Sequence, residues 1–226
     1  MKHAGRLQRI LHRISPLKRE RGAMLRRFYD KIGFVNFGTV HQHDDEYDAI
    51  RGFTASLTHQ DGHFAVGSYE GYDIRMVERF DILSLPGQKQ HLQTWAIIEI
   101  NLNVRNVPHI FFVPTGNEGA EYSRLFATQP YMQPINSLFS SHHSPEFHGR
   151  YQILARTTHA RDAEVIFDSP TIVGIGSRFW PHGIEVEHGK LFVYLTEKHL
   201  TRQMLDVTLA SALWLAGTIR QSQEDI

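Results

Sequence analysis

The chain has 226 residues, no cysteine, 24 basic and 24 acidic residues, and 11% aromatic residues. This length and aromatic content are typical of one packed domain with at most an appendage, and they exclude a disordered or low-complexity chain. The lack of cysteine excludes disulfides and thiolate metal sites, and no apolar run reaches the roughly 18 residues that a membrane-spanning helix needs.

The balanced total charge conceals a split along the chain. Residues 1–31 carry ten basic and two acidic residues, a net charge of +8, so the remainder carries −8. We therefore predict two parts, a basic helical arm at residues 1–33 and a single α+β domain at residues 34–226. A positive arm on an acidic body can bind an anionic surface or fold back on that body.

The first part of the arm has the pattern of a basic amphipathic helix. An apolar stripe at helical spacing is flanked by arginines: Leu7, Ile10, Leu11, Ile14, Arg6, Arg9 and Arg13. This pattern suits the interface of an anionic membrane, and we predict that residues 1–14 bind one. The alternatives are fraying, docking on the acidic body, and an organellar transit peptide.

A second helix is predicted over residues 16–32. Ser15 offers an N-cap, Pro16 suits a first turn and Gly33 is a plausible stop. The apolar face of this helix is broad and rich in aromatic residues, so we expect it to pack on the domain rather than on a membrane.

Residues 34–150 are predicted to be mostly strand, with a polar loop at 38–49. Residues 72–82 alternate apolar and polar side chains, which predicts a half-buried strand with Arg79 and Asp81 on its polar side. Residues 94–104 are apolar on both sides at their start, so this strand is placed centrally in the sheet. Residues 109–113 are a further short strand, and residues 115–146 are expected to be a surface excursion with a short helix around 118–126.

The last third is predicted as a strand at 151–156, a short helix at 160–168, strands at 184–187 and 191–195, and a helix over 200–219. His188-Gly189 suits a primed hairpin turn, whereas Gly174 and Gly176 are expected in a turn. Because residues 50–113 lack helical crossovers, the sheet should be antiparallel. The fold class is α+β: a mostly antiparallel sheet with a basic N-terminal helical arm, a short internal helix and a long C-terminal packing helix. One core cluster is predicted to contain Ile98, Ile100, Phe112, Ile153, Val193, Leu209 and Leu213.

Two histidine groups are candidate zinc sites. His41 and His43 stand at i, i+2 beside three carboxylates, and a second group contains His142, His143 and His148. Imidazole and carboxylate are accepted zinc ligands, but polar loops with solvated side chains are the competing interpretation because no H-E-x-x-H motif is present. Glu185 and Glu187 share one face of a strand and are expected to be solvated. Trp180-Pro181-His182 is expected at the sheet edge.

The order of several motifs along residues 24–196 is also informative. These motifs are Ile32-Gly33-Phe34, the turn at 67–71 with Phe80-Asp81-Ile82, the strands ending near Pro108 and Pro114, and the segments 146–153 and 163–170. Their order resembles an uncharacterised bacterial domain family that is often found behind N-terminal membrane segments. This chain has a basic arm in place of those segments. The resemblance implies no reaction, so no catalytic residue is carried over.

We therefore predict a non-enzymatic binding or scaffold module without a cofactor. It is expected to be cytoplasmic and peripheral to the inner membrane face through its basic helix, with an anionic membrane surface or another protein as partner. The acidic body would repel phosphate, which argues against a nucleic-acid partner. The alternative is a metal-dependent hydrolase that uses zinc at the His/Asp/Glu clusters. Ligand, pathway and oligomeric state are not predicted.

Overall fold

A computed structural model describes residues 16–40, 50, 52, 59–83, 91–105, 107–126, 131–136 and 144–224. Within these residues a nine-stranded sheet forms the centre of the molecule, with neighbouring strands antiparallel and in the order β1-β2-β3-β4-β9-β8-β5-β7-β6. The strands are β1 Val35–Val40, β2 Gln60–Tyr69, β3 Tyr72–Leu83, β4 His91–Asn101, β5 Ile110–Pro114, β6 Gln133–Pro134, β7 Tyr151–Ala155, β8 Gly183–Glu187 and β9 Lys190–Thr196.

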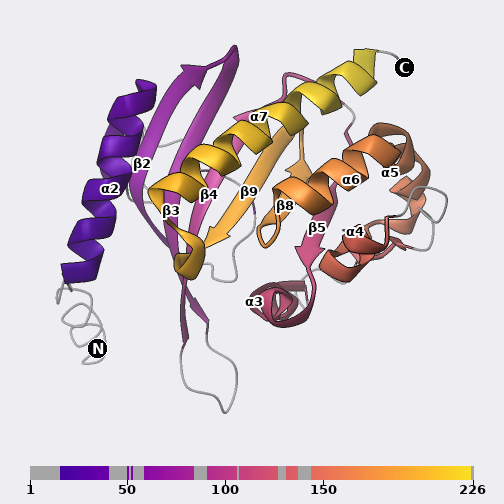
Figure 1. Cartoon of the computed structure of the whole chain (residues 1–226), viewed down its shortest axis with the longest axis horizontal. Coiled ribbons are helices and arrows are strands. Elements are labelled where there is room, and N and C mark those ends of the chain that lie inside the picture. The colour runs from indigo at the N-terminus through magenta and orange to yellow at the C-terminus, as the bar shows by residue number, and fades with distance from the viewer. Residues whose placement is uncertain are drawn as a thin grey trace.

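The helices are α2 Pro16–Ile32, α3 Gly116–Phe126, α4 Pro145–Arg150, α5 Ala160–Ile166, α6 Ser169–Arg178 and α7 Arg202–Glu224, with 3₁₀ turns at Thr157–His159 and Glu197–His199. All of them except α3 cover one face of the sheet, whereas α3 contributes Tyr122 to the core on the other face. Figure 1 shows α7 running across the middle strands, with α2 on one side of it and α5 and α6 on the other. The predicted α+β class is confirmed, including the long C-terminal helix. No helix in the described part of the chain is both long and apolar enough to cross a membrane.

The first core lies between the sheet and helices α2, α4, α5, α6 and α7. It contains all seven residues predicted to share one cluster, from Ile98 on β4 to Leu213 on α7. Helix α2 adds Leu25, Phe28 and Tyr29, each at most 1% exposed. The expectation that the second helix packs on the domain is therefore confirmed, because its aromatic stripe is part of this core.

A second core covers the opposite face of the sheet. Its members include Val77, Trp95, Ile97, Phe111 and Tyr194 from the strands, and Ile50, Tyr122 and Met132 from segments that pass over them. Strand β3 was expected to be half-buried, and for the second half of the strand this was wrong: Arg79 and Asp81 on its polar side are 1% and 0% exposed, whereas Asp73 on the same side is exposed. The covering segments close off a face that the alternation of β3 by itself marks as polar.

The two predicted tight turns are confirmed. Glu70-Gly71 and His188-Gly189 both have positive φ at both positions, 50° and 82° in the first and 50° and 71° in the second. Positive φ at both central residues is the geometry that matches the twist of the flanking strands. Strand β4, predicted to be central, is fourth in the sheet and buried from Trp95 to Ile100. Strand β1, by contrast, continues to Val40 where a loop was expected from Gly38.

The turn predicted at Gly174 and Gly176 was wrong, since both residues lie within α6. Asp168 caps this helix by accepting a hydrogen bond from the Thr171 amide at 2.9 Å, and Pro170 lies in its first turn. A Cβ at Gly174 would lie 2.3 Å from the indole of Trp214 on α7. The glycine is therefore needed for close contact between two helices, not for a change of chain direction.

Candidate functional site

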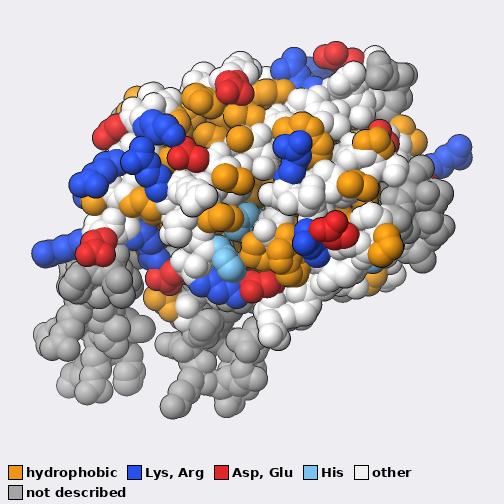
Figure 2. Space-filling view, in the orientation of Figure 1, with side chains coloured by type: hydrophobic (Ala, Val, Ile, Leu, Met, Phe, Trp, Pro, Cys, Tyr) orange, Lys and Arg blue, Asp and Glu red, His pale blue; other side chains and the backbone are white. Residues whose placement is uncertain are grey.

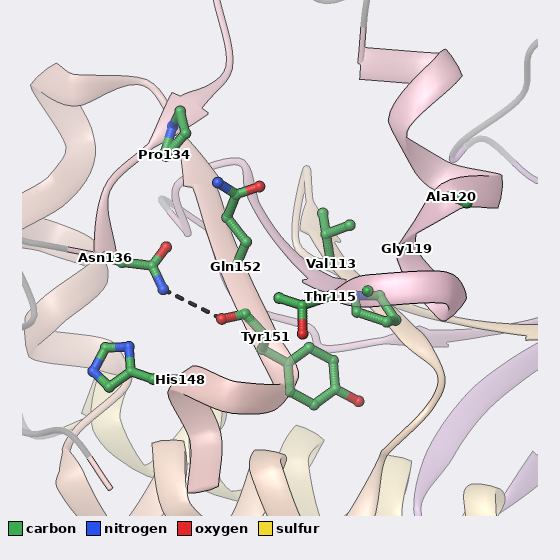
Figure 3. A pocket seen from close by; sticks show the side chains of 11 residues that line it. Val113, Thr115, Gly119, Ala120, Pro134, Asn136, His148, Tyr151 and Gln152 are labelled. Atoms are coloured by element: carbon green, nitrogen blue, oxygen red, sulfur yellow. Dashed lines mark hydrogen bonds between the residues drawn. The ribbon is translucent and has the colours of Figure 1, made fainter. Parts of the chain in front are cut away.

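A cavity of about 670 Å³ opens beside α3, where β5 ends and β7 begins. The described residues of its walls come from β5, α3, β6, α4 and β7, and none of these described residues is Asp, Glu, Lys or Arg: Val113, Pro114, Thr115, Gly116, Gly119, Ala120, Pro134, Asn136, His148, Tyr151 and Gln152. Figure 3 shows Val113 and Gln152, which are direct cross-strand partners, side by side between α3 and Asn136. We refer to this cavity as the strand-end pocket.

Hydrogen bonds hold the walls of the strand-end pocket in place. The side chain of Asn136 accepts from the Ile153 amide at 2.8 Å and donates to the Tyr151 carbonyl at 3.3 Å, a bond drawn in Figure 3. Across the pocket, the Thr115 hydroxyl donates to the Gly149 carbonyl and the Thr115 amide to the Arg150 carbonyl, each at 2.8 Å. The pocket is thus preformed by contacts that do not involve a ligand.

Helix α3 begins directly at the end of β5. Gly116 turns the chain with φ +64°, and a Cβ at Gly119 would lie 2.1 Å from the Pro114 carbonyl oxygen. The first turn of α3 can therefore lie against β5 only because position 119 has no side chain. This contact sets the width of the pocket on its α3 side.

The sequence-predicted metal residues are only partly described. His148 is exposed on α4 and lines the strand-end pocket. Ser144 caps that short helix by accepting from the Phe147 amide at 3.1 Å, and Phe147 anchors it in the first core. His41, His43, His142 and His143 lie outside the described residues, as do the predicted membrane-binding residues Arg6, Arg9, Arg13, Leu7, Ile10, Leu11 and Ile14. The zinc and membrane predictions for those positions stay predictions.

A different group of side chains in the described chain has metal-binding chemistry. His109, just before β5, and Glu185 and Glu187 on β8 each offer a ligand atom, and these atoms lie within 4.8 Å of one another. Nε2 of His109 lies 2.7 Å from Oε1 of Glu185, and Nδ1 lies 3.5 Å from Oε1 of Glu187. The Tyr194 hydroxyl donates to the other oxygen of Glu185. We call His109, Glu185 and Glu187 the His109 cluster.

The electrostatics of the His109 cluster favour a positive charge. Burial lowers the pKa of His109, but the hydrogen bond to Glu185 and the charges of both glutamates outweigh it, so the pKa lies above its ordinary value. Glu185 is only 2% exposed, so the expectation that it is solvated was wrong. The sequence placed Glu185 and Glu187 on one face; it carried no signal that His109, 76 positions from Glu185, lies beside them.

The ring of a second histidine, His182, is buried beside that of His199. His182 is 2% exposed, and among the described residues neither of its ring nitrogens has a hydrogen-bond partner. Burial, and then the charge of His199 at a ring-centroid distance of 6.1 Å, lowers the pKa of His182 to about 4. The sheet-edge placement was wrong, because the strand that His182 precedes, β8, lies between β9 and β5.

Comparisons with known proteins identify one fold neighbour. No family model and no curated protein matches the chain. The crystal structure of the mycobacterial trehalose monomycolate transport factor A, TtfA, is similar at a TM-score of 0.55 and 10% identity, over 89% of this chain and 96% of that chain. The likeness is one of fold.

Proposed function

We propose that this protein is a non-enzymatic binding module whose strand-end pocket takes a small ligand without net charge. The observation that supports this proposal is the wall chemistry: about 670 Å³ of preformed space whose described walls are apolar and neutral polar groups and the imidazole of His148. Ligand sites of roughly 300–1,000 Å³ with a few fixed polar groups are typical of small-molecule binding. A charged ligand would lose hydration there without gaining a side chain of opposite charge.

The mixed wall points to an amphiphile as the ligand class. Val113, Pro114 and Ala120 offer apolar contact, while Thr115, Asn136 and Gln152 present hydroxyl and amide groups. The fold neighbour is named as a transport factor for trehalose monomycolate, and that name supports a binding or transport-associated role over catalysis. The module would then hold its ligand rather than change it.

Ligand charge is the property to test. We expect octyl glucoside, below its micelle concentration, to stabilise the full chain against thermal unfolding, while octyl sulfate and octyltrimethylammonium give no specific shift. At a ligand concentration ten times the dissociation constant, binding should add about 1.4 kcal/mol to the free energy of unfolding. Isothermal titration calorimetry should give one site.

A pocket-filling variant separates this site from general detergent binding. Gln152→Trp places an indole between α3 and β6, and it should abolish binding of octyl glucoside. Gln203→Trp is the matched control, since Gln203 is also exposed but lies on α7 away from the pocket. Equal affinity of the two variants would contradict the proposal, as would tighter binding of either charged detergent.

The described part of α2 supports membrane attachment as a second role. Arg19, Arg26 and Arg27 are exposed on this helix, while its opposite side lies in the first core. Figure 2 shows basic side chains gathered over α2, on the left of the view. Residues 1–14, which precede this helix, carry four more cations beside their apolar stripe. We infer peripheral binding to an anionic membrane, with α2 presenting part of the basic surface.

Salt-sensitive flotation tests this second role. The four cations of residues 1–14 should contribute roughly 4 kcal/mol at an anionic leaflet, since each basic residue contributes about 1 kcal/mol. The full chain should therefore float with phosphatidylserine-containing vesicles at low salt, and less at high salt because exposed charges are screened. Deleting residues 1–14 should reduce recovery strongly, and Arg26→Gln/Arg27→Gln should reduce it further.

Two controls make the flotation result decisive. Neutral phosphatidylcholine vesicles should recover neither the full chain nor the deletion, and Arg161→Gln, an exposed arginine on α5, should float like the original chain. Equal recovery of the full chain and the deletion with anionic vesicles at low salt would refute a membrane role for the arm. Lower thermal stability of the deletion would instead indicate docking on the acidic body.

A further inference from the structure

The His109 cluster places two carboxylates against one imidazole ring. Oε1 of Glu185 lies 2.7 Å from Nε2 of His109, and Oε1 of Glu187 lies 3.5 Å from Nδ1. Glu185 is 2% exposed and Glu187 is half-buried, so water screens these charges only in part. The charged groups beside the cluster in the described chain include Arg156, which follows β7, Lys190, the cross-strand partner of Glu187, and His188, whose Nε2 lies 3.6 Å from Glu187.

We propose that the His109 cluster binds one divalent transition-metal ion of the zinc class. One imidazole nitrogen and two carboxylate oxygens are a donor set that Zn²⁺ accepts, while the nitrogen disfavours Mg²⁺ and Ca²⁺. The ligand atoms already lie within 4.8 Å of one another. Ligand bonds of about 2.0–2.2 Å place neighbouring donors roughly 3–3.5 Å apart, so a modest rotation of Glu187 completes the set.

The surroundings of the cluster resemble a supporting shell for such an ion. Strand pairing fixes two of the ligands, because Ile110 on β5 pairs with Val186 on β8 and so aligns His109 with Glu187. The Tyr194 hydroxyl holds the second oxygen of Glu185, leaving the first oxygen directed at His109. Ligating carboxylates are commonly oriented by such second contacts. The site has an entry route, since the side chains of His109 and Glu187 are 13% and 24% exposed.

Zinc titration of the full chain tests this inference. Isothermal titration calorimetry with Zn²⁺ at pH 7.5 should give one equivalent, and Mg²⁺ should give no heat above dilution. Binding displaces the proton that His109 shares with Glu185, so affinity should rise with pH and heats should differ between buffers of different ionisation enthalpy. His109→Gln and Glu187→Gln should each weaken zinc binding at least about 100-fold, and Tyr194→Phe about 10-fold as an orienting contact.

The controls distinguish this site from the other histidines. His148→Gln alters an exposed imidazole outside the cluster and should leave zinc binding unchanged. The paired variants His41→Gln/His43→Gln and His142→Gln/His143→Gln should also retain one equivalent. If His109→Gln keeps zinc binding while either paired variant loses it, the inference is overturned. Less than one equivalent of bound zinc at 100-fold excess would also overturn it, and the cluster would then be an ion pair only. The cluster shares no residue with the strand-end pocket, so His109→Gln and Glu187→Gln should bind octyl glucoside like the original chain.

Discussion

Replacing Arg79 with methionine should lower the free energy of unfolding by about 3–5 kcal/mol, because it removes the guanidinium that pairs with both oxygens of the buried Asp61 carboxylate. His59, whose Nε2 lies 3.6 Å from Asp61, makes no such two-bond pair. Arg79 on β3 and Asp61 on β2 are direct cross-strand partners, 1% and 3% exposed. The guanidinium donates to both carboxylate oxygens at 2.9 Å, and also to the Ile50 carbonyl at 2.6 Å. Methionine keeps most of the side-chain volume, so loss of packing contributes little.

Urea denaturation of three variants measures this effect. Asp61→Leu/Arg79→Met removes both charges and should regain most of the stability lost in Arg79→Met, since replacing a buried pair by apolar side chains is often neutral. Arg161→Met, at an exposed position, should change stability by less than about 0.5 kcal/mol. If the double variant is as unstable as Arg79→Met, then packing or the bond to Ile50 dominates, and the charge argument fails.

The second large effect should be a loss of stability in mild acid caused by His182. Its folded-state pKa of about 4 lies below the ordinary value of 6.5, so between these two values the unfolded chain binds more protons than the folded chain. Stability contributed by this group is full above pH 6.5 and falls as the pH is lowered towards 4. A depression of this size corresponds to about 3 kcal/mol at the acid end of the window.

His182→Leu isolates that contribution. Between pH 7 and pH 4 the free energy of unfolding should fall by about 3 kcal/mol less in the variant than in the original chain. The variant should also be more stable at both pH values, because it does not bury the ring nitrogens that have no hydrogen bond among the described residues. His188→Gln, at an exposed turn, should keep the original pH dependence. His109 acts in the opposite direction: its raised pKa adds stability that is present at low pH and lost as the pH rises above 6.5. Identical pH profiles for His182→Leu and the original chain would show that His182 is not buried in the neutral form.

The positions of the strands and the long helix could be predicted because their information is local. Alternation along residues 72–82 and the two Gly-containing turns fixed β3 and both hairpins without reference to the rest of the chain. The burial of Arg79 could not be predicted in the same way. Alternation of apolar and polar residues shows that the two faces of a strand differ. Whether the polar face is exposed to water depends on segments from elsewhere in the chain, here those that contain Ile50 and Tyr122.

The strand-end pocket could not be predicted from the sequence for a related reason. Its walls are threonine, asparagine, proline and glycine, residues that occur in most loops, and they come from stretches between Val113 and Gln152 that only the sheet brings together. The metal sites were predicted at residues 41–43 and 142–148 because those stretches are rich in histidine. The described chain instead offers His109 with two glutamates from a strand that pairs with β5.

Sequence by itself determined the α+β class, the antiparallel pairing, the first core from Ile98 to Leu213, and the charge split between arm and body. These features follow from residue period, turn chemistry and composition, which act over a few neighbouring residues. Only the tertiary structure decided that Gly174 lies against Trp214, that Glu185 lies between His109 and Tyr194, and that the ring of His182 is buried with no hydrogen bond from the described residues. These contacts join side chains from different elements, 9 residues apart for Glu185 and Tyr194 and 76 for His109 and Glu185. Neither the residue period nor the composition encodes which group from another element will contact a given side chain.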